Sequence, residues 1–123
     1  MNVEGESMTT PMERLRGKIT KEVLWLYILR LLKERPMYAY ELKQHIKNAF
    51  GFEPATVSSY VVLYKLEKDG FVSASWQESE SGKPSRKYYR LTPKGERLLG
   101  EGIEFLEETL RKLKGGSSKG TEG

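Results

Sequence analysis

The sequence contains no cysteine and a single histidine, His45, among its 123 residues. Without cysteine there is neither a disulfide framework nor thiolate chemistry, a composition typical of a reducing compartment. One histidine without a second ligand at metal spacing predicts no metal site, and nothing in the chain calls for a cofactor. The sequence also lacks a nucleophile–histidine–acid set and a glycine loop that could cradle phosphates, so we expect a protein that is not an enzyme.

Long apolar runs and a signal peptide are missing too. The longest mostly apolar run covers residues 23–32, includes Arg30 and is too short to cross a bilayer. The first 14 residues are polar and do not resemble a signal peptide. We therefore expect a cytoplasmic protein with no membrane partner. The length suits one domain with its own core, and the net charge of +4 favours a polyanionic partner.

The functional interpretation depends most on residues 53–70, which predict a helix. Pro54 suits its first turn and Gly70 its end. At 100° per residue, one face is an ordinary core stripe formed by Ala55, Ser59, Val62, Leu63 and Leu66. The opposite face has Lys65 beside it and consists of Val57, Tyr60, Val61, Tyr64 and Lys68.

This second face is unusual, because a helix held by one side normally shows charged residues to water. Valine, tyrosine and lysine together suit the major groove of duplex DNA. Apolar groups would contact thymine methyls, hydroxyls would bond base edges, and ammonium groups would meet phosphates. The alternative is a helix buried on both sides, in a larger core or in a dimer. The helix alone leaves both interpretations open.

Two further helices are predicted upstream. Residues 21–35 lie between a cap at Thr20 and a stop at Pro36, and they are apolar nearly all round, which predicts the central buried helix. Trp25 belongs either to the core or to a subunit contact. Residues 39–50 predict the second helix, with an inward face of Tyr40, Leu42, Ile46 and Phe50. The link GFEP that follows is short enough to force the sharp angle of a helix-turn-helix.

A β-hairpin is predicted downstream of residue 70. Residues 71–77 and 86–91 have strand character, and the loop SESGKPS between them is rich in turn residues. Lys83, Arg86 and Lys87 make its tip basic. The hairpin is either a wing that lies along the sugar-phosphate backbone or simply a solvated loop.

The last helix is predicted to start after a cap at Thr92. It carries two apolar lines, a heptad-like seam and a shorter line of Leu98 and Phe105 beside it. A partner subunit is the preferred cover for these lines, and packing on the same domain is the alternative. The seam consists of Leu99, Ile103, Leu106, Leu110 and Leu113.

Four segments within residues 15–113 resemble the PadR-like family of transcriptional regulators. The segments ILRLL (28–32) and PMYAYEL (36–42) are similar to that family's buried helix and its plyGYEl signature, with Ala39 in place of the usual glycine. Tyr60 to Val72 resembles YpxLxxLExxGlv, with Val61 in place of a frequent proline. GKPSRKYYRLTPKG (82–95) resembles the wing signature GrPrrkyYrLTpxG.

The resemblance implies a winged helix-turn-helix dimer made by its terminal helices. It also implies that Trp25 and Phe105 are the aromatic residues available for a pore that binds a flat aromatic effector. Residues 56–59, TVSS, replace the family's glycine-rich start of this helix, so no DNA sequence preference carries over.

We thus predict a mainly α fold with a small β-hairpin (α+β). Residues 1–10 and 115–123 are expected to be disordered, 11–92 to form the winged helix-turn-helix, and 93–114 the dimerisation helix. The predicted function is a homodimeric repressor of a palindromic operator in double-stranded DNA. The alternatives are a regulator that responds to an aromatic or xenobiotic ligand, and a dimeric protein-interaction module that does not bind DNA. The predicted DNA contacts are Thr56, Val57, Ser58, Ser59, Tyr60, Tyr64, Lys65 and Lys68 on the helix and Lys83, Arg86 and Lys87 on the wing.

Overall fold

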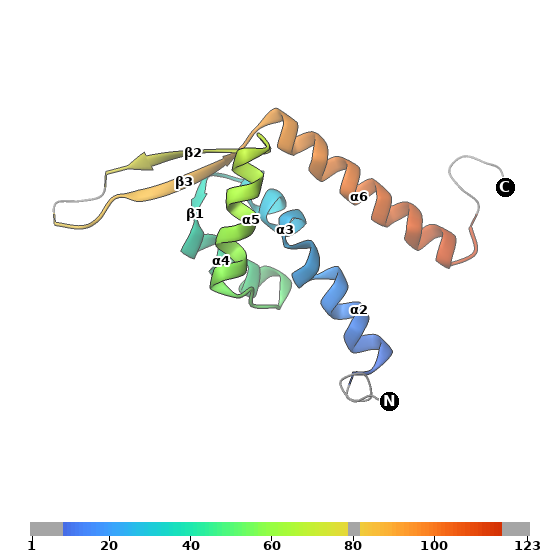
Figure 1. The fold of residues 1–123 in the computed structure, drawn as a ribbon. Coiled ribbons are helices and arrows are strands. Elements are labelled where there is room, and N and C mark those ends of the chain that lie inside the picture. The colour runs from blue at the N-terminus through green and yellow to red at the C-terminus, as the bar shows by residue number, and fades with distance from the viewer. Residues whose placement is uncertain (1–8, 79–81, 117–123) are drawn as a thin grey trace.

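The computed structural model describes residues 9–78 and 82–116. The predictions for residues 1–8, 79–81 and 117–123 lie outside this part of the chain. The fold is mainly helical, as predicted, and its small sheet has three antiparallel strands (Figure 1). Its elements in chain order are α2 (Pro11–Ile19), η1 (Lys21–Val23), α3 (Leu24–Leu32), β1 (Met37–Tyr38), α4 (Ala39–Phe50), α5 (Thr56–Lys68), β2 (Val72–Gln77), β3 (Arg86–Leu91) and α6 (Pro93–Leu113).

Helix α3 is the centre of the core, which confirms the prediction of a central buried helix. It contacts α4, α5, α6 and β3, and Ile28 and Leu29 are almost completely buried. Burial of such side chains contributes about 1.5–3 kcal/mol each. The other buried core residues come from the helices and strands packed around α3. They include Leu42 and Ile46 of α4, Leu63 and Leu66 of α5, Val72 of β2, Tyr89 of β3 and Leu99 of α6.

The predicted limits of this helix, residues 21–35, were wrong at both ends. The Thr20 hydroxyl donates to the Arg16 carbonyl of α2 instead of capping the next helix, and residues 21–23 form the separate 3₁₀ turn η1. At the other end α3 stops at Leu32, because Pro36 disfavours helical backbone in the residue before it. Thr10, placed in the disordered end by the sequence, is the N-cap of α2 in a capping box with Glu13.

Helix α4 has the predicted bounds and ends at Gly51, whose φ of 80° is left-handed. Two residues of its predicted inward face were misplaced. Tyr40 is 63% exposed, because it lies in the first turn of α4, beyond the edge of the core. Phe50 is 39% exposed and keeps one edge contact, with its ring centroid 4.9 Å from that of Tyr27.

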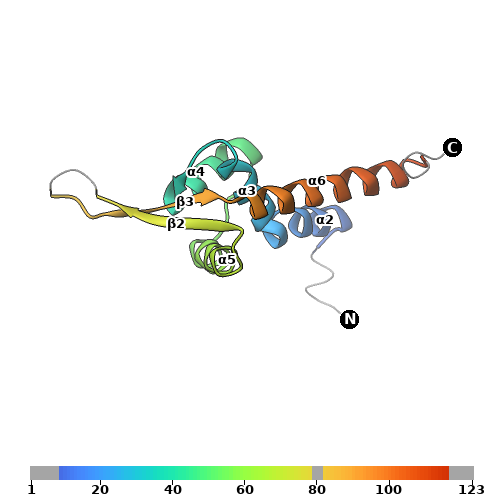
Figure 2. The same ribbon diagram turned by 90° about the horizontal axis from the view of Figure 1, so that it is seen from above.

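The sheet has the order β1-β3-β2. Strands β2 and β3 form the predicted hairpin, with Val72 opposite Leu91 and Trp76 opposite Lys87. The third strand, β1, was not predicted, because it is only two residues long and its pairing with β3 depends on tertiary contacts. The hairpin projects from one side of the body, whereas α2 and the far end of α6 project from the other (Figure 1 and Figure 2).

Helix α6 starts at the end of β3. The Thr92 hydroxyl accepts from the Gly95 N–H and lies 2.7 Å from the Gly70 carbonyl, which joins the helix to the base of the hairpin. Further along, a Cβ atom at Gly102 would lie 2.8 Å from Leu26 Cδ1, so glycine there permits close packing of α6 on α3.

Candidate nucleic-acid interface

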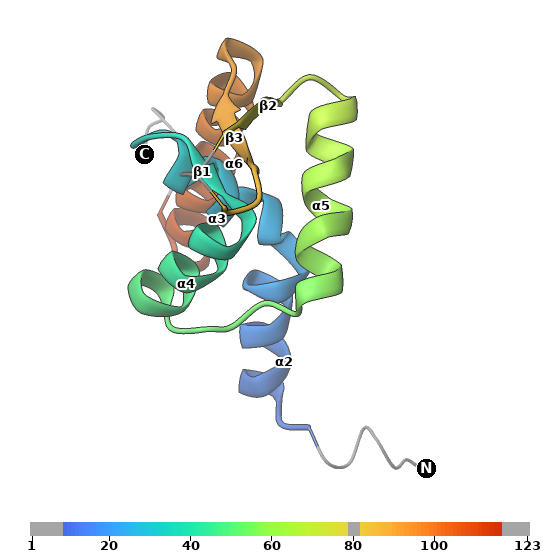
Figure 3. The same ribbon diagram turned by 90° about the vertical axis from the view of Figure 1, so that its left-hand side faces the viewer.

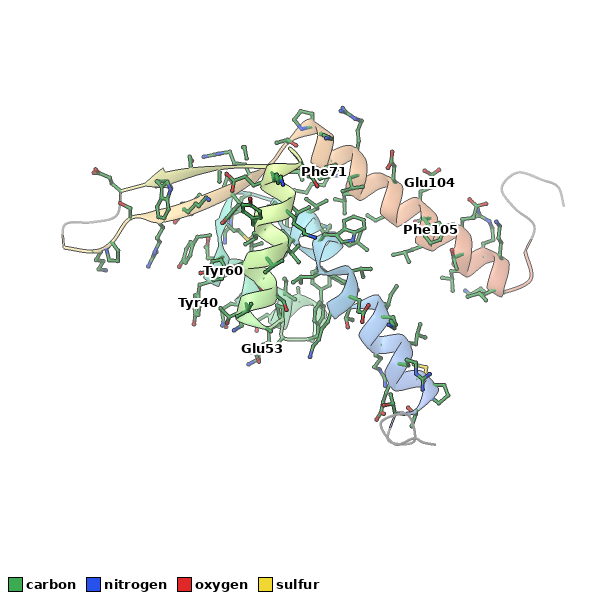
Figure 4. The ribbon with its side chains drawn as sticks, in the orientation of Figure 1. Tyr40, Glu53, Tyr60, Phe71, Glu104 and Phe105 are labelled. Carbon is green, nitrogen blue, oxygen red and sulfur yellow. The ribbon has the colours of Figure 1, made fainter. Side chains whose placement is uncertain are left out.

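The second face of α5 is exposed in the protomer. Val57, Tyr60, Val61 and Tyr64 are 75%, 55%, 50% and 65% exposed, while Leu63 and Leu66 on the other side are buried. The alternative that this helix is buried on both sides within the core of one protomer is therefore wrong. Large apolar and aromatic side chains exposed together mark an interaction surface. Figure 4 shows Tyr60 on this helix.

Ser59 does not belong to this surface, although it was among the predicted DNA contacts. Its side chain is buried, and its hydroxyl donates to the Ala55 carbonyl one turn earlier, at 3.0 Å. The prediction was inconsistent with the helical wheel, which places Ser59 with Leu63 and Leu66.

The start of α5 is open to an incoming anion. The helix begins at Thr56 instead of Pro54, because Ala55 is extended (ψ 145°) and serves as the N-cap. No side chain caps this end, and the first turn holds no acidic residue. The Lys43 ammonium on α4 donates to the Thr56 hydroxyl at 2.8 Å. This hydrogen bond places a cation beside the positive end of the helix.

The wing carries its three predicted cations in two different settings. Lys83 and Arg86 are exposed, and the Arg86 guanidinium lies 4.4 Å from the centre of the Tyr38 ring. Lys87 instead faces α5, where its ammonium contacts the Glu67 carboxylate at 3.1 Å. This pair ties the wing to α5, because it joins β3 to the last turns of that helix.

The same region makes stability sensitive to alkaline pH. The pKa of Lys87 is raised by its hydrogen bond to Glu67, and burial raises the pKa of Tyr89 and of Tyr27. All three groups hold their protons more tightly in the folded chain than in the unfolded one. We therefore expect the free energy of unfolding to fall as pH rises above the usual values of 10.0 and 10.5. Urea titrations between pH 8 and 11 test this, and Lys87→Met should reduce the fall.

Both end helices present apolar side chains to solvent. On α6, Leu99 is buried and Leu106 half-buried, whereas Ile103, Phe105, Leu110 and Leu113 are 39%, 70%, 54% and 79% exposed. On α2, which has no buried residue, Met12 and Leu15 are 51% and 55% exposed. Exposed apolar lines on two projecting helices are typical of a surface that another subunit covers.

The residues of the predicted effector pore lie on different helices. Trp25 is half-buried on α3, with its ring beside Gly102 of α6. Phe105 lies one turn further along α6 and is exposed (Figure 4). Binding of an aromatic effector to these residues stays a prediction.

The part of the chain that the structure describes contains neither a membrane span nor a metal-binding cluster. No helix in that part of the chain combines the length and apolar character of a membrane span. Residues 9–78 and 82–116 also contain no group of three or more histidine, aspartate or glutamate side chains arranged to hold a metal ion.

The region just described matches a known protein family. The model of the PadR-like family of transcriptional regulators matches residues 28–101, which is more than half of the chain. The chain belongs to the PadR-like family. The match extends from α3 through the wing into the first turns of α6, so it includes the exposed face of α5.

Individual PadR-like structures resemble most of this chain. A PadR-like transcription factor from Bacteroides fragilis is 34% identical, covers 82% of this chain and 96% of its own, and superposes with a TM-score of 0.69. Bacillus subtilis PadR, solved in complex with operator DNA, is 26% identical over 66% of this chain and 47% of its own, with a TM-score of 0.61. An uncharacterized protein from Lysinibacillus sphaericus is 38% identical over 99 residues, which are 76% of this chain and 87% of that protein.

Membership of the PadR-like family decides the broad function. The chain is a transcriptional regulator with a winged helix fold. The residues that contact DNA and the assembly that presents them are argued below from the structure.

Proposed function

We propose that this PadR-like regulator is a homodimeric repressor that binds a roughly palindromic operator. The observation that carries the proposal is the exposed valine–tyrosine–lysine face of α5, placed beside a wing with exposed cations. In a dimer, two copies of α5 would enter successive major grooves about one turn apart. Bacillus subtilis PadR, a relative of this chain, is solved in complex with operator DNA, which supports DNA binding by this chain.

The contacts divide between bases and phosphates. Thr56, Val57, Ser58 and Tyr60 lie near the start of α5, where base edges come within reach. The contacts to the sugar-phosphate backbone come from Tyr64, Lys65, Lys68, Lys83 and Arg86. Lys87 is not in this set, since Glu67 already neutralises it.

The salt dependence of DNA binding tests this assignment. Gel shifts on random duplex at low salt should show binding, and the log–log slope of affinity against salt should be about −6 to −9 if 6–10 phosphates are neutralised. Arg86→Gln should reduce the slope by about 2, because a dimer loses two phosphate contacts. Lys87→Gln is the matched control and should leave the slope nearly unchanged. A protein that shows no affinity for duplex in dilute buffer would instead favour a protein-interaction module.

The proposed dimer uses α6 and α2. Both project from the side of the body opposite the wing, so joining two copies there leaves α5 and the wing of each copy accessible (Figure 1). The exposed leucines of α6 and the apolar residues of α2 would supply the buried area. This assembly also accounts for the apolar lines that the protomer leaves uncovered.

Charge placed on α6 should therefore dissociate the dimer. Leu110→Glu together with Leu113→Glu should weaken association on the order of 100-fold or more, because each buried carboxylate would lack a partner. Sedimentation velocity measures the change. Val61→Glu makes the same kind of substitution on α5 and should leave a dimer that no longer binds DNA. A leucine variant that stays dimeric would place the interface elsewhere.

A further inference from the structure

Two adjoining hollows lie under the hairpin, between α4 and α5. One has a volume of about 270 Å³ and the other about 200 Å³, and both are lined by Ala39, Tyr40 and Tyr60. Together they form one trough that runs from the hairpin to the start of α5. Seen along the wing in Figure 3, β1 and the first turn of α4 lie on one side of this region and α5 on the other. We call it the aromatic trough, after its residues Tyr38, Tyr40, Tyr60, Trp76 and Tyr89.

Trp76 is the most exposed aromatic side chain of the trough. It lies on the same face of β2 as Val72, which is buried, and Ala74, which is half-buried. The hairpin has already left the body at Trp76, so its indole is 68% exposed. Trp76 is therefore not part of the buried core of the protomer.

Tyr40 and Tyr60 face the same side of the molecule from two different helices (Figure 4). Both are more than half exposed, and Tyr60 also belongs to the proposed DNA-binding face of α5. The trough is thus continuous with that face. Because Tyr40 was predicted to face the core, its position on the same side as Tyr60 was not predicted.

The charges along the trough are all positive. Arg86 lines it at the hairpin end and Lys43 at the end near Thr56, whereas Lys87, which also lines it, is already paired with Glu67. Among the described residues that line either hollow there is no aspartate or glutamate. Aromatic rings between cations suit a polymer in which apolar sugars alternate with anionic phosphates.

We propose that the aromatic trough seats the sugar-phosphate backbone of one DNA strand. The Tyr40 hydroxyl donates to a phosphate oxygen, and the Trp76 indole packs on the neighbouring deoxyribose. The proposal rests on the DNA binding proposed above and adds two neutral contacts that lie outside the recognition helix and outside the cations of the wing. Since both act on the backbone, they raise affinity for any duplex and carry no base preference.

Neutral contacts can be separated from charged ones by their salt dependence. Fluorescence anisotropy with a labelled random duplex, over a range of salt concentrations, measures Kd for the full chain and for the variants Tyr40→Phe and Trp76→Ala. Each variant should raise Kd on the order of tenfold at every salt concentration, with the log–log slope unchanged. Intrinsic fluorescence gives a second readout, because DNA should quench Trp76. The quench should be absent in Trp76→Phe, which retains only the half-buried Trp25.

The outcomes separate this inference from the proposed function. If the wild-type chain binds duplex but both variants bind equally well and Trp76→Phe shows the wild-type quench, the trough is empty in the complex and only this inference fails. If a neutral variant flattens the salt slope, it has displaced cations indirectly, and the direct contacts are disproved. If the wild-type chain does not bind duplex in dilute buffer, the proposed function fails and the inference with it.

Discussion

Replacing Val57 by aspartate is expected to weaken DNA binding on the order of 100-fold or more. Val57 is 75% exposed in the first turn of α5, where the proposed complex brings base edges and phosphates close. A carboxylate there would be repelled by the phosphates and would lose its water without gaining a partner, twice in each dimer. Electrophoretic mobility shifts on random duplex at low salt measure the loss.

The same substitution should leave folding almost untouched. An exposed position tolerates the change within about 0.5 kcal/mol, and an acidic residue in the first turn favours the positive end of the helix. Asn48→Asp introduces the same charge at an exposed position near the end of α4, away from the proposed interface, and should bind DNA nearly as well as the wild type. If both variants lost DNA affinity equally, the net charge of the protein would account for the effect and contacts from the α5 face would not.

The largest expected effect on stability comes from Gly95→Ala. A Cβ atom at this position would collide with the Phe71 carbonyl oxygen and lie 2.8 Å from Leu91 Cδ1. That oxygen has little freedom to move, since the Thr92 N–H and hydroxyl both contact it, at 3.3 and 3.0 Å. We expect a loss of about 3 kcal/mol or more, typical of a severe backbone clash. Urea unfolding at fixed protein concentration measures it.

Gly100→Ala is the matched control on the same helix. No atom lies within 4 Å of a Cβ built there, and the position is helical and exposed. The substitution should raise the free energy of unfolding by about 0.5–1 kcal/mol, because alanine is the better helix former. Similar stability of the two variants would show that the base of the hairpin adapts to an added methyl group.

The sequence predicted those features that local patterns determine. The apolar character of α3, the caps at Thr92 and Gly51 and the alternation in β2 each follow from neighbouring residues, and the structure confirms them. The free face of α5 was also predictable, because its tyrosines and valines fall opposite the core stripe. The order of the main helices and of the hairpin followed from the same local patterns.

Features that depend on distant contacts were not predictable. The pairing of Met37 with Tyr89 needs β3 beside it, and a two-residue strand has no periodicity of its own. The exposure of Tyr40 depends on where the core ends, which a helical wheel does not show. The pairing of Lys87 with Glu67 was missed for a similar reason, since the spacing along the chain gives no sign that β3 crosses the end of α5.

Strand β3 gives the molecule a mechanical link between its two ends. It passes from Arg86 on the wing to Leu91, and a single residue later α6 begins, clamped by the contacts of Thr92 with residues 70 and 71. No loop separates the two elements to absorb a rotation. In the proposed dimer, a change in the crossing angle of the paired α6 helices would therefore move both wings. The pitch of the bound duplex would then favour one crossing angle of these helices.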